Sequence, residues 1–506
     1  MTDPPQVLEK LTAGEERFAR LRRRAGHVLA PVVFLALLLA PLPVLSPEAH
    51  RLAAVMAAVI VLWVTEAIPM PVTALLGAAA CVALRVAPAK DVFAPFADPL
   101  MFLFIGAFIL ARGIFVHHLH RRLAFTVLSW RWVGARPSRI LFAFGAVTAF
   151  SSAWISNTAT TAMMFAIGMS ILAFLFEDSE SGAPPAVPLR YATGLMLMTS
   201  FAASIGGLAT PIGTPPNVIG LGFIRNLLGV ELPFFRWAMI GVPVVVVLYL
   251  FLFFYLNALS GGGSGEIPGG GEMLRREKSR LGPWTRAQKS TLAAFLVTVS
   301  LWIAPGIVAL VAGTESLLYQ NLHGSVPESV AALLGAALLF LLPGDSGQRA
   351  ITWEDAVKID WGVVLLYGGG FALGVLSFDT GLAEAVGRGI TGLLPIQGGF
   401  GLLVASTIAA VLLSETTSNT ASANMIVPVV IAISRASGMD PLAPALGATF
   451  GASLGFMLPV STPCNAIVYG SGYVPLGRMM RYGILLDIAG VIVIVTFVTL
   501  LAPFLR

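Results

Sequence analysis

The chain has 506 residues, of which 57% are hydrophobic and only 11% are charged, and its formal net charge is +5. This composition excludes a soluble globular domain and indicates an all-α integral membrane protein with many spans. The basic residues stand in short segments between apolar runs, which fits membrane topology and argues against nucleic acid as a partner.

The first apolar runs follow a polar N-terminal tail, residues 1–27, which contains Arg22, Arg23 and Arg24. Such a basic tail is expected to stay in the cytoplasm. Each run that follows is near the ~20 residues that a spanning helix needs. The expected spans of this part are 28–46, 51–69, 71–88 and 98–116.

A segment rich in basic and aromatic residues, 117–138, comes next and predicts an amphipathic helix in the cytoplasmic interface. Its three histidines, His117, His118 and His120, are expected on a solvated face. A metal site is the weaker interpretation, because no acidic residue or cysteine accompanies them.

Polar residues interrupt the next apolar stretch, 139–176, at Ser156-Asn157-Thr158. A straight span would expose some of these groups to lipid, whereas a re-entrant hairpin gathers them at its tip. A span at 187–224 is broken by TPIGTPPN, whose prolines cannot sustain a helical ladder. A span at 237–258 then completes a first repeat, 28–258, before a glycine-rich basic linker, 259–288, that is expected to be flexible.

The second repeat, 289–506, follows the same plan. Its segment LLYGGGFALG matches LFIGAFILARG of the first half, with Gly106 and Gly369 in equivalent places. The expected elements are spans at 289–311, 326–343 and 360–378, an amphipathic piece at 379–394, a hairpin at 399–436 with Ser418-Asn419-Thr420 at its tip, a broken span at 441–474 with LPVSTPCN, and a last span at 482–503.

This plan gives about eleven spans and two hairpins. The expected cytoplasmic segments hold roughly three times as many Lys and Arg as the external ones, which supports a cytoplasmic N-terminus and an external C-terminus in a cell (plasma or inner) membrane. The two hairpins then enter from opposite sides of the membrane. The repeats are therefore predicted to be inverted, so that one central site can face each side in turn.

The tips and breaks contain no lysine or arginine. An anionic substrate would have to be held by hydroxyl and amide donors, by helix N-termini and by a bound cation. Neutral oxygen ligands of this kind suit sodium. One such cluster would be interpreted as holding helices together, but two matching clusters, each followed by a matching break, favour a transport site.

Glu415 stands beside the second tip and is an acid at membrane depth, whereas Ala153 stands at the matching place in the first half. A proton-coupling role is one interpretation, and a structural hydrogen-bonding role is favoured over it.

The paired SNT tips, the GTPPN and STPCN breaks, WVTEAIPMPVTALL and SLGFMLPVSTPCNAIV resemble the divalent anion/sodium symporter family from about residue 50 to 500. The resemblance implies a homodimeric, elevator-type transporter with scaffold and transport domains. It implies sodium as the coupling ion, no organic cofactor, and a C4-dicarboxylate such as succinate as substrate, with citrate and sulfate as alternatives.

Site residues carried over from the resemblance form three sets. One sodium ion would meet Ser152, Ser156, Asn157 and Gly213. The other sodium ion would meet Ser414, Thr417, Asn419 and Ser461. The substrate would meet Asn157, Thr158, Ser418, Asn419, Thr420, Thr214, Pro215, Thr462 and Pro463.

Two residues depart from the family pattern. Cys464 stands where a second proline is frequent, and Asn424 adds an amide where small residues are usual. Some relatives exchange anions without sodium, so a sodium-independent dicarboxylate exchanger is the alternative function. An ion channel is the alternative of another class. A membrane enzyme is disfavoured, because no His, Asp or Cys cluster accompanies the tips.

Overall fold

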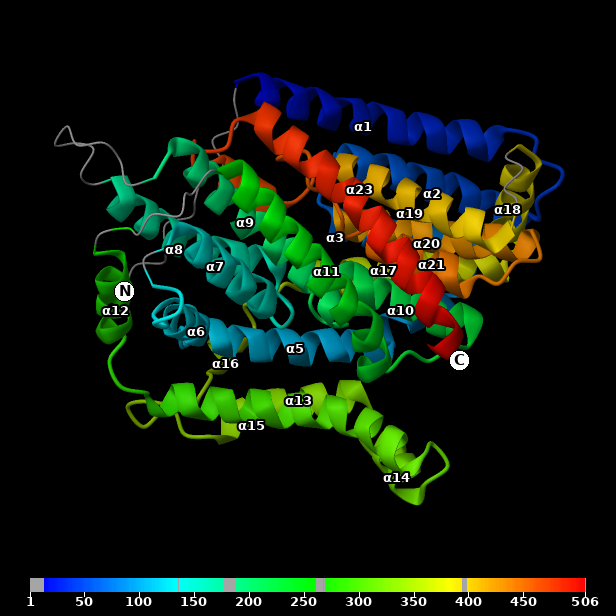
Figure 1. Cartoon of the computed structure of the whole chain (residues 1–506). Coiled ribbons are helices and arrows are strands. Elements are labelled where there is room, and N and C mark those ends of the chain that lie inside the picture. The colour runs from blue at the N-terminus through cyan, green and yellow to red at the C-terminus, as the bar shows by residue number, and fades with distance from the viewer. Residues whose placement is uncertain are drawn as a thin grey trace.

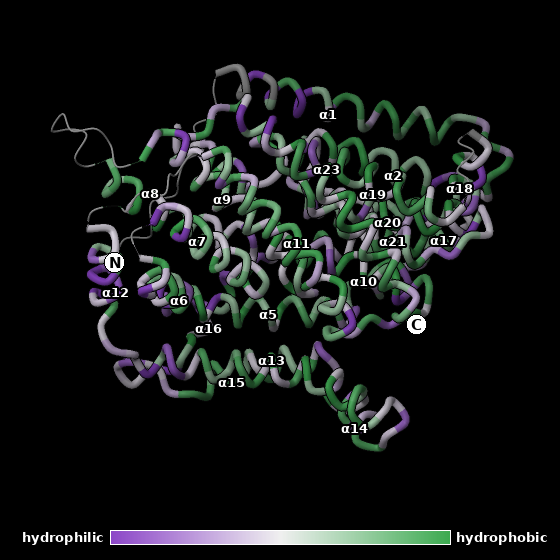
Figure 2. Tube along the Cα trace, in the orientation of Figure 1, coloured by the Kyte–Doolittle hydropathy of each residue, from purple (hydrophilic) through white to green (hydrophobic). Residues whose placement is uncertain are grey.

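The computed structural model describes residues 13–134, 136–176, 187–260, 267, 269–393 and 398–505. Within these ranges the chain is helical, with a single isolated β-bridge between Pro343 and Arg349 and no strand. Hydrophobic residues dominate the middle of the molecule, and polar ones gather towards its two ends (Figure 2). This pattern confirms the prediction of an all-α membrane protein.

The helices up to the end of the first repeat are α1 (Ala13–Leu39), α2 (Pro47–Thr65), α3 (Met70–Ala83), α4 (Ala89–Phe93), α5 (Pro99–Val116), α6 (Leu119–Leu128), α7 (Pro137–Ser152), α8 (Asn157–Phe176), α9 (Leu189–Gly206), α10 (Pro215–Leu228) and α11 (Phe234–Ser260). Short 3₁₀ turns occupy Ala94–Ala97 and Gly207–Ala209.

The remaining helices are α12 (Gly270–Arg280), α13 (Arg286–Ala312), α14 (Leu317–Ser325), α15 (Glu328–Leu341), α16 (Trp353–Ala356), α17 (Trp361–Asp379), α18 (Leu382–Leu393), α19 (Gly398–Thr416), α20 (Asn419–Ala436), α21 (Leu442–Gly451), α22 (Pro463–Tyr469) and α23 (Leu476–Leu501), followed by a 3₁₀ turn at Ala502–Leu505.

By length and composition, nine helices within the described ranges can cross a membrane, or ten if the bent pair α14 and α15 counts as one span. Two of the nine, α8 and α19, are arms of the hairpins. In contrast, α3 and α15 have only 14 residues each. Several of the eleven expected spans are therefore short or broken helices rather than single long ones.

The two halves repeat each other in their packing. Helix α5 crosses α15 at Gly106, and α17 crosses α3 at Gly369, and in both places a Cβ would collide with an alanine of the partner helix. The amphipathic helices that follow, α6 and α18, lie at opposite ends of the molecule (Figure 1). This is the arrangement that inverted repeats require.

One expectation on the connecting segments needs correction. Residues 13–27, the described part of the expected cytoplasmic tail, are helical and continue directly into the first apolar run as α1. The linker expected to be flexible contains α12, which packs on α6. Arg122 of α6 donates hydrogen bonds to the carbonyls of Leu281, Gly282 and Pro283 after α12, and these bonds hold the linker against the helical body. Residues 1–12, 261–266 and 268 lie outside the described residues.

Helix α9 occupies the centre and is buried along its length from Tyr191 to Gly206. The arm α7 packs on α9, as the arm α19 packs on α21. The polar tips of both hairpins are thereby placed next to the breaks that follow α9 and α21.

Candidate functional site

In both hairpin tips a serine and the asparagine five residues after it are joined by a hydrogen bond. At the first tip Ser152, at the end of α7, lies 2.7 Å from the carboxamide of Asn157, the first residue of α8. At the second tip Ser414 Oγ lies 2.8 Å from the carboxamide of Asn419, the first residue of α20. The same five-residue spacing thus ties both helix starts to the preceding arm.

The two breaks are also held in the same way. Asn217 donates through Nδ2 to the carbonyls of Gly207 and Thr210, at 2.9 and 2.8 Å. Asn465 donates to the carbonyls of Gly455 and Leu458, at 2.9 and 3.0 Å. Because each asparagine reaches carbonyls ten and seven residues before it, one side chain replaces the hydrogen bonds that the unwound helix has lost.

The breaks begin new helices at prolines. Pro215 and Pro463 are the first residues of α10 and α22, where the missing amide hydrogen has no cost. Thr462 accepts a hydrogen bond from the Asn465 amide at 3.1 Å and caps α22.

The halves cross over at the centre. Helix α22 of the second half packs on α8 and α9, and α10 of the first half packs on α20 and α21. Ser200 of α9 donates to Oδ1 of Asn465 at 2.5 Å. The thiol of Cys464 lies against the hydroxyls of Thr158, Thr161 and Ser204. Each tip therefore meets the break of the other half as well as its own.

Three of the four residues expected at the first sodium site come together. With its amide nitrogen turned towards them, Asn157 donates to Ser152 Oγ and to the carbonyls of Ala203, at 3.2 Å, and Gly213, at 3.3 Å. Gly207 is required here, because a Cβ at this position would collide with the Asn157 carboxamide. Ser156 is exposed and instead accepts from the Ala159 amide at 3.3 Å.

The second expected site is assembled in part. Ser414 also donates to the Ala452 carbonyl at 2.9 Å, and Asn419 lies 3.4 Å from the Ser453 carbonyl. Thr417 is turned away towards Ser422, at 2.7 Å. The hydroxyl of Ser461 donates to the Glu415 carboxylate at 2.6 Å.

The expected substrate residues differ in how far they are accessible. Thr158 and Pro463 are exposed, and Asn157, Pro215, Ser418 and Asn419 are half-buried. Thr214, Thr420 and Thr462 are buried. The accessible residues come from both tips and both breaks.

Several buried polar atoms around the tips have no hydrogen-bond partner. They are the hydroxyls of Ser151, Thr160 and Ser453, together with Oδ1 of Asn217 and of Asn424. The hydroxyls of Thr161 and Ser204 have no partner other than the Cys464 thiol. Unpaired polar groups at this depth are costly. Neutral hydroxyl, amide and carbonyl oxygens form a donor set that suits sodium.

Glu415 is 2% exposed and accepts from the Met457 amide at 2.8 Å as well as from Ser461. The buried Asp487 of α23 faces it. The sequence analysis missed Asp487, although a lone acid within the apolar span at 482–503 was a usable signal.

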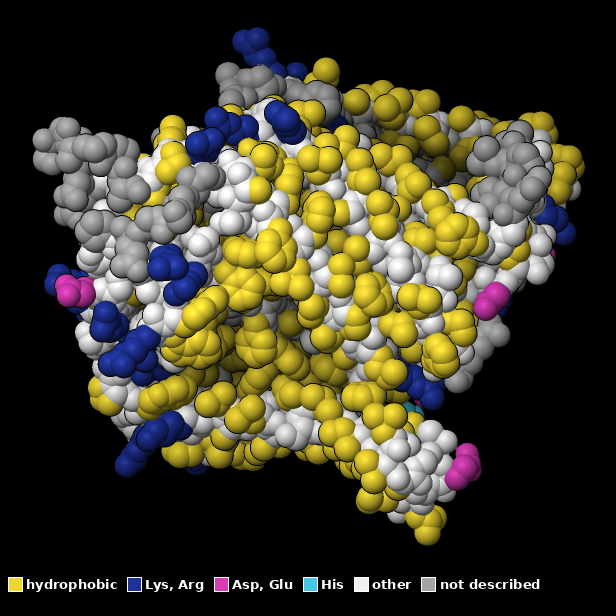
Figure 3. All heavy atoms as spheres, in the orientation of Figure 1, with side chains coloured by type: hydrophobic (Ala, Val, Ile, Leu, Met, Phe, Trp, Pro, Cys, Tyr) yellow, Lys and Arg dark blue, Asp and Glu magenta, His cyan; other side chains and the backbone are white. Residues whose placement is uncertain are grey.

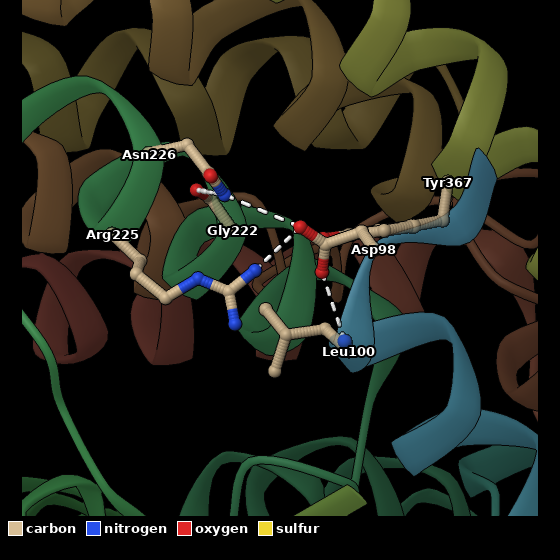
Figure 4. A network of polar contacts seen from close by, with 6 residues as sticks. All are labelled: Asp98, Leu100, Gly222, Arg225, Asn226 and Tyr367. Atoms are coloured by element: carbon tan, nitrogen blue, oxygen red, sulfur yellow. Dashed lines mark hydrogen bonds and ion pairs between the residues drawn. The ribbon is translucent and has the colours of Figure 1, made fainter. Parts of the chain in front are cut away.

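A polar network fixes the far end of α10 (Figure 4). Asp98, the N-cap of α5, pairs with Arg225 of α10 and accepts from Asn226 at 3.3 Å and from the Tyr367 hydroxyl at 3.2 Å. It also accepts from the Leu100 amide at 2.8 Å. Helices α5, α10 and α17 are thereby joined through one buried carboxylate.

The histidines of the interfacial segment do not form one solvated face. His118 is exposed, but His120 is buried and bonds the Ile114 carbonyl at 3.2 Å, and His117 bonds the Ala350 carbonyl at 2.5 Å. Burial lowers the pKa of His120 to about 4. Within the described residues no group of three or more His, Cys, Asp or Glu side chains could hold a metal ion.

Comparison with known proteins gives a consistent result. The family model described as "Sodium:sulfate symporter transmembrane region" matches residues 22–505. The sodium-dependent dicarboxylate transporter SdcS of Staphylococcus saprophyticus is 33% identical over 497 residues, covering 97% of this chain and 93% of that protein. SdcS of Staphylococcus aureus is 32% identical over 487 residues, covering 94% and 91%.

Two solved structures share the fold. The YdaH transporter of Alcanivorax borkumensis superposes with a TM-score of 0.55 at 13% identity, covering 83% of this chain and 89% of that one. MtrF of Neisseria gonorrhoeae superposes with a TM-score of 0.55 at 14% identity, covering 95% and 97%. The extent of the family match and of the SdcS alignments shows that the chain belongs to the divalent anion/sodium symporter family and is a membrane transporter, not an enzyme.

Proposed function

We propose that this protein is a secondary transporter that couples the entry of sodium to the uptake of a C4-dicarboxylate such as succinate. The observation that carries the proposal is the duplicated tip and break, in which Ser152–Asn157 and Ser414–Asn419 are paired at the same spacing and consist of neutral hydroxyl and amide groups. The names of the similar SdcS proteins support sodium and dicarboxylates in particular.

The donor set explains why sodium would be needed. The tips and breaks carry no lysine or arginine, so a dianion would meet only hydroxyls, amides and the N-termini of α8, α10 and α20. Sodium at Ser152, Asn157 and Gly213, and at Ser414 and Asn419, would supply positive charge beside the substrate. The dianion would then bind well only after the cations, which couples the two fluxes.

We further propose that transport moves the hairpins and breaks as one body against a fixed scaffold. In such a motion the helices α5, α10 and α17 would either move together or break the Asp98 network that joins them. Helix α13 is the least buried of the candidate spans and presents an apolar face, which suits the interface of a homodimer.

The distribution of charge supports a cytoplasmic N-terminus. Lys and Arg side chains gather at the end of the molecule that holds α12 and the start of α13, and hydrophobic side chains cover the middle (Figure 3). By the positive-inside rule this end would face the cytoplasm of a cell membrane.

The test is uptake of radiolabelled succinate into proteoliposomes, with an inward sodium gradient or with potassium in its place. We expect sodium-dependent accumulation that Asn157→Ala and Asn419→Ala abolish, while the control Asn321→Ala on the exposed face of α14 retains it. Uptake that ignores sodium but requires internal dicarboxylate would indicate an exchanger. Uptake that does not saturate would indicate a channel.

A further inference from the structure

Asp487 is an unexplained acid in the middle of α23. It is 5% exposed, and its carboxylate lies beside the Glu415 carboxylate and the Phe456 amide, although neither of its oxygens makes a hydrogen bond of normal geometry. A charged side chain at this depth is costly unless it is paired, and such residues line ion pathways in membrane proteins. A carboxylate in this position must either share a proton with a neighbour or pair with a cation.

The face of α23 around Asp487 is pressed against the unwound segment 452–462. Gly483 and Gly490 lie one turn to either side on the same face. A Cβ at Gly483 would collide with the backbone of Phe456, and one at Gly490 would collide with the Leu454 side chain. Asp487 is thus aimed at the second break rather than at lipid.

Glu415 meets Asp487 from the other side. Its carboxylate oxygens are held by the Met457 amide, at 2.8 Å, and by the Ser461 hydroxyl, at 2.6 Å, so its position is fixed. Neither α19 nor the segment 452–462 contains Lys, Arg or His, and the basic residues of α23 stand more than a turn before Asp487. Two buried carboxylates therefore face each other without a cationic side chain between them.

We propose that Glu415 and Asp487 bind an additional sodium ion behind the second break, distinct from the two tip sites, an inference that rests on the proposed sodium-coupled function. Carboxylate oxygens are hard ligands that suit sodium, and two of them provide a stronger site than the neutral oxygens of the tips. Since Glu415 also holds Met457 and Ser461, an ion here would fix the backbone of the break and favour the binding geometry at the second tip.

The experiment counts sodium. Binding of ²²Na⁺ to the purified full-length protein is measured in detergent, without substrate, for the wild type, Asp487→Asn, Glu415→Gln and the exposed control Glu315→Gln. We expect Asp487→Asn and Glu415→Gln each to bind one sodium ion fewer per chain than the wild type, at both mildly acidic and mildly alkaline pH. The control Glu315→Gln should bind as many as the wild type. In proteoliposomes we expect at least a tenfold rise in the sodium concentration that half-saturates uptake.

Two outcomes would overturn the site. One is an unchanged sodium count in Asp487→Asn. The other is measured on the wild type alone, so it decides the question even if a variant fails to fold. A carboxylic acid band that persists in the infrared spectrum at saturating sodium, and that titrates with pH, would mean that the pair shares a proton instead. If the wild type binds sodium but does not transport succinate, the proposed function fails while the sodium count still decides the site.

Discussion

The asparagines that hold the two breaks allow a prediction with a worked magnitude. Both are fully buried, and both donate two hydrogen bonds to carbonyls of the unwound segments. They differ at the side-chain oxygen: Oδ1 of Asn465 accepts a hydrogen bond from Ser200, whereas Oδ1 of Asn217 has no partner. A buried hydrogen bond contributes about 1 kcal/mol net. Replacement by alanine should therefore cost about 2 kcal/mol at Asn217 and about 3 kcal/mol at Asn465.

The assay is the free energy of unfolding in mixed detergent micelles, titrated with a denaturing detergent and followed by tryptophan fluorescence. Asn321→Ala, on the exposed face of α14, should change it by less than about 0.5 kcal/mol. The test is that Asn465→Ala loses more free energy of unfolding than Asn217→Ala, since this difference depends on the single extra hydrogen bond to Ser200. Equal losses, or a larger loss at Asn217, would refute it.

Three further predictions concern separate parts of the molecule. Gly207→Ala should abolish succinate uptake, because its Cβ collides with the first tip, whereas Gly389→Ala, which has open space around it, should leave uptake unchanged. Tyr367→Phe should lower the free energy of unfolding by about 1–2 kcal/mol through loss of its bond to Asp98. Burial lowers the pKa of His120 to about 4, so the unfolded chain takes up its proton first as the pH falls from about 6.5. The wild type should therefore lose stability between about pH 6.5 and pH 4, and His120→Asn should flatten this slope in melting curves.

The helix breaks could be predicted from the sequence because their causes are local. Pro215 and Pro463 fix where α10 and α22 begin, and polar tripeptides inside apolar runs fix the hairpin tips. The same motifs contained Asn217 and Asn465, but their role depends on carbonyls that only the folded break brings within reach. The assignment of these residues required the structure.

Contacts between distant segments could not be predicted from the sequence for a similar reason. Glu415 was visible as a membrane acid, yet its partner lies on α23, and no local pattern connects the two positions. His120 was misplaced because a segment of basic and aromatic residues does not reveal which side chains turn inwards. The helix α12 was missed because glycine runs before it dominate the composition of the linker.

The crossing of the two halves bears on how coupling can arise. If each tip met only its own break, the two proposed sodium sites could bind their ions independently. In this fold α10 packs on α20 and α22 packs on α8, and Ser200 of the first half bonds Asn465, which holds the second break. A change that orders one break therefore alters the contacts of the opposite tip. We expect sodium at either tip to raise the affinity of the other, and by thermodynamic reciprocity the substrate to raise the affinity of both.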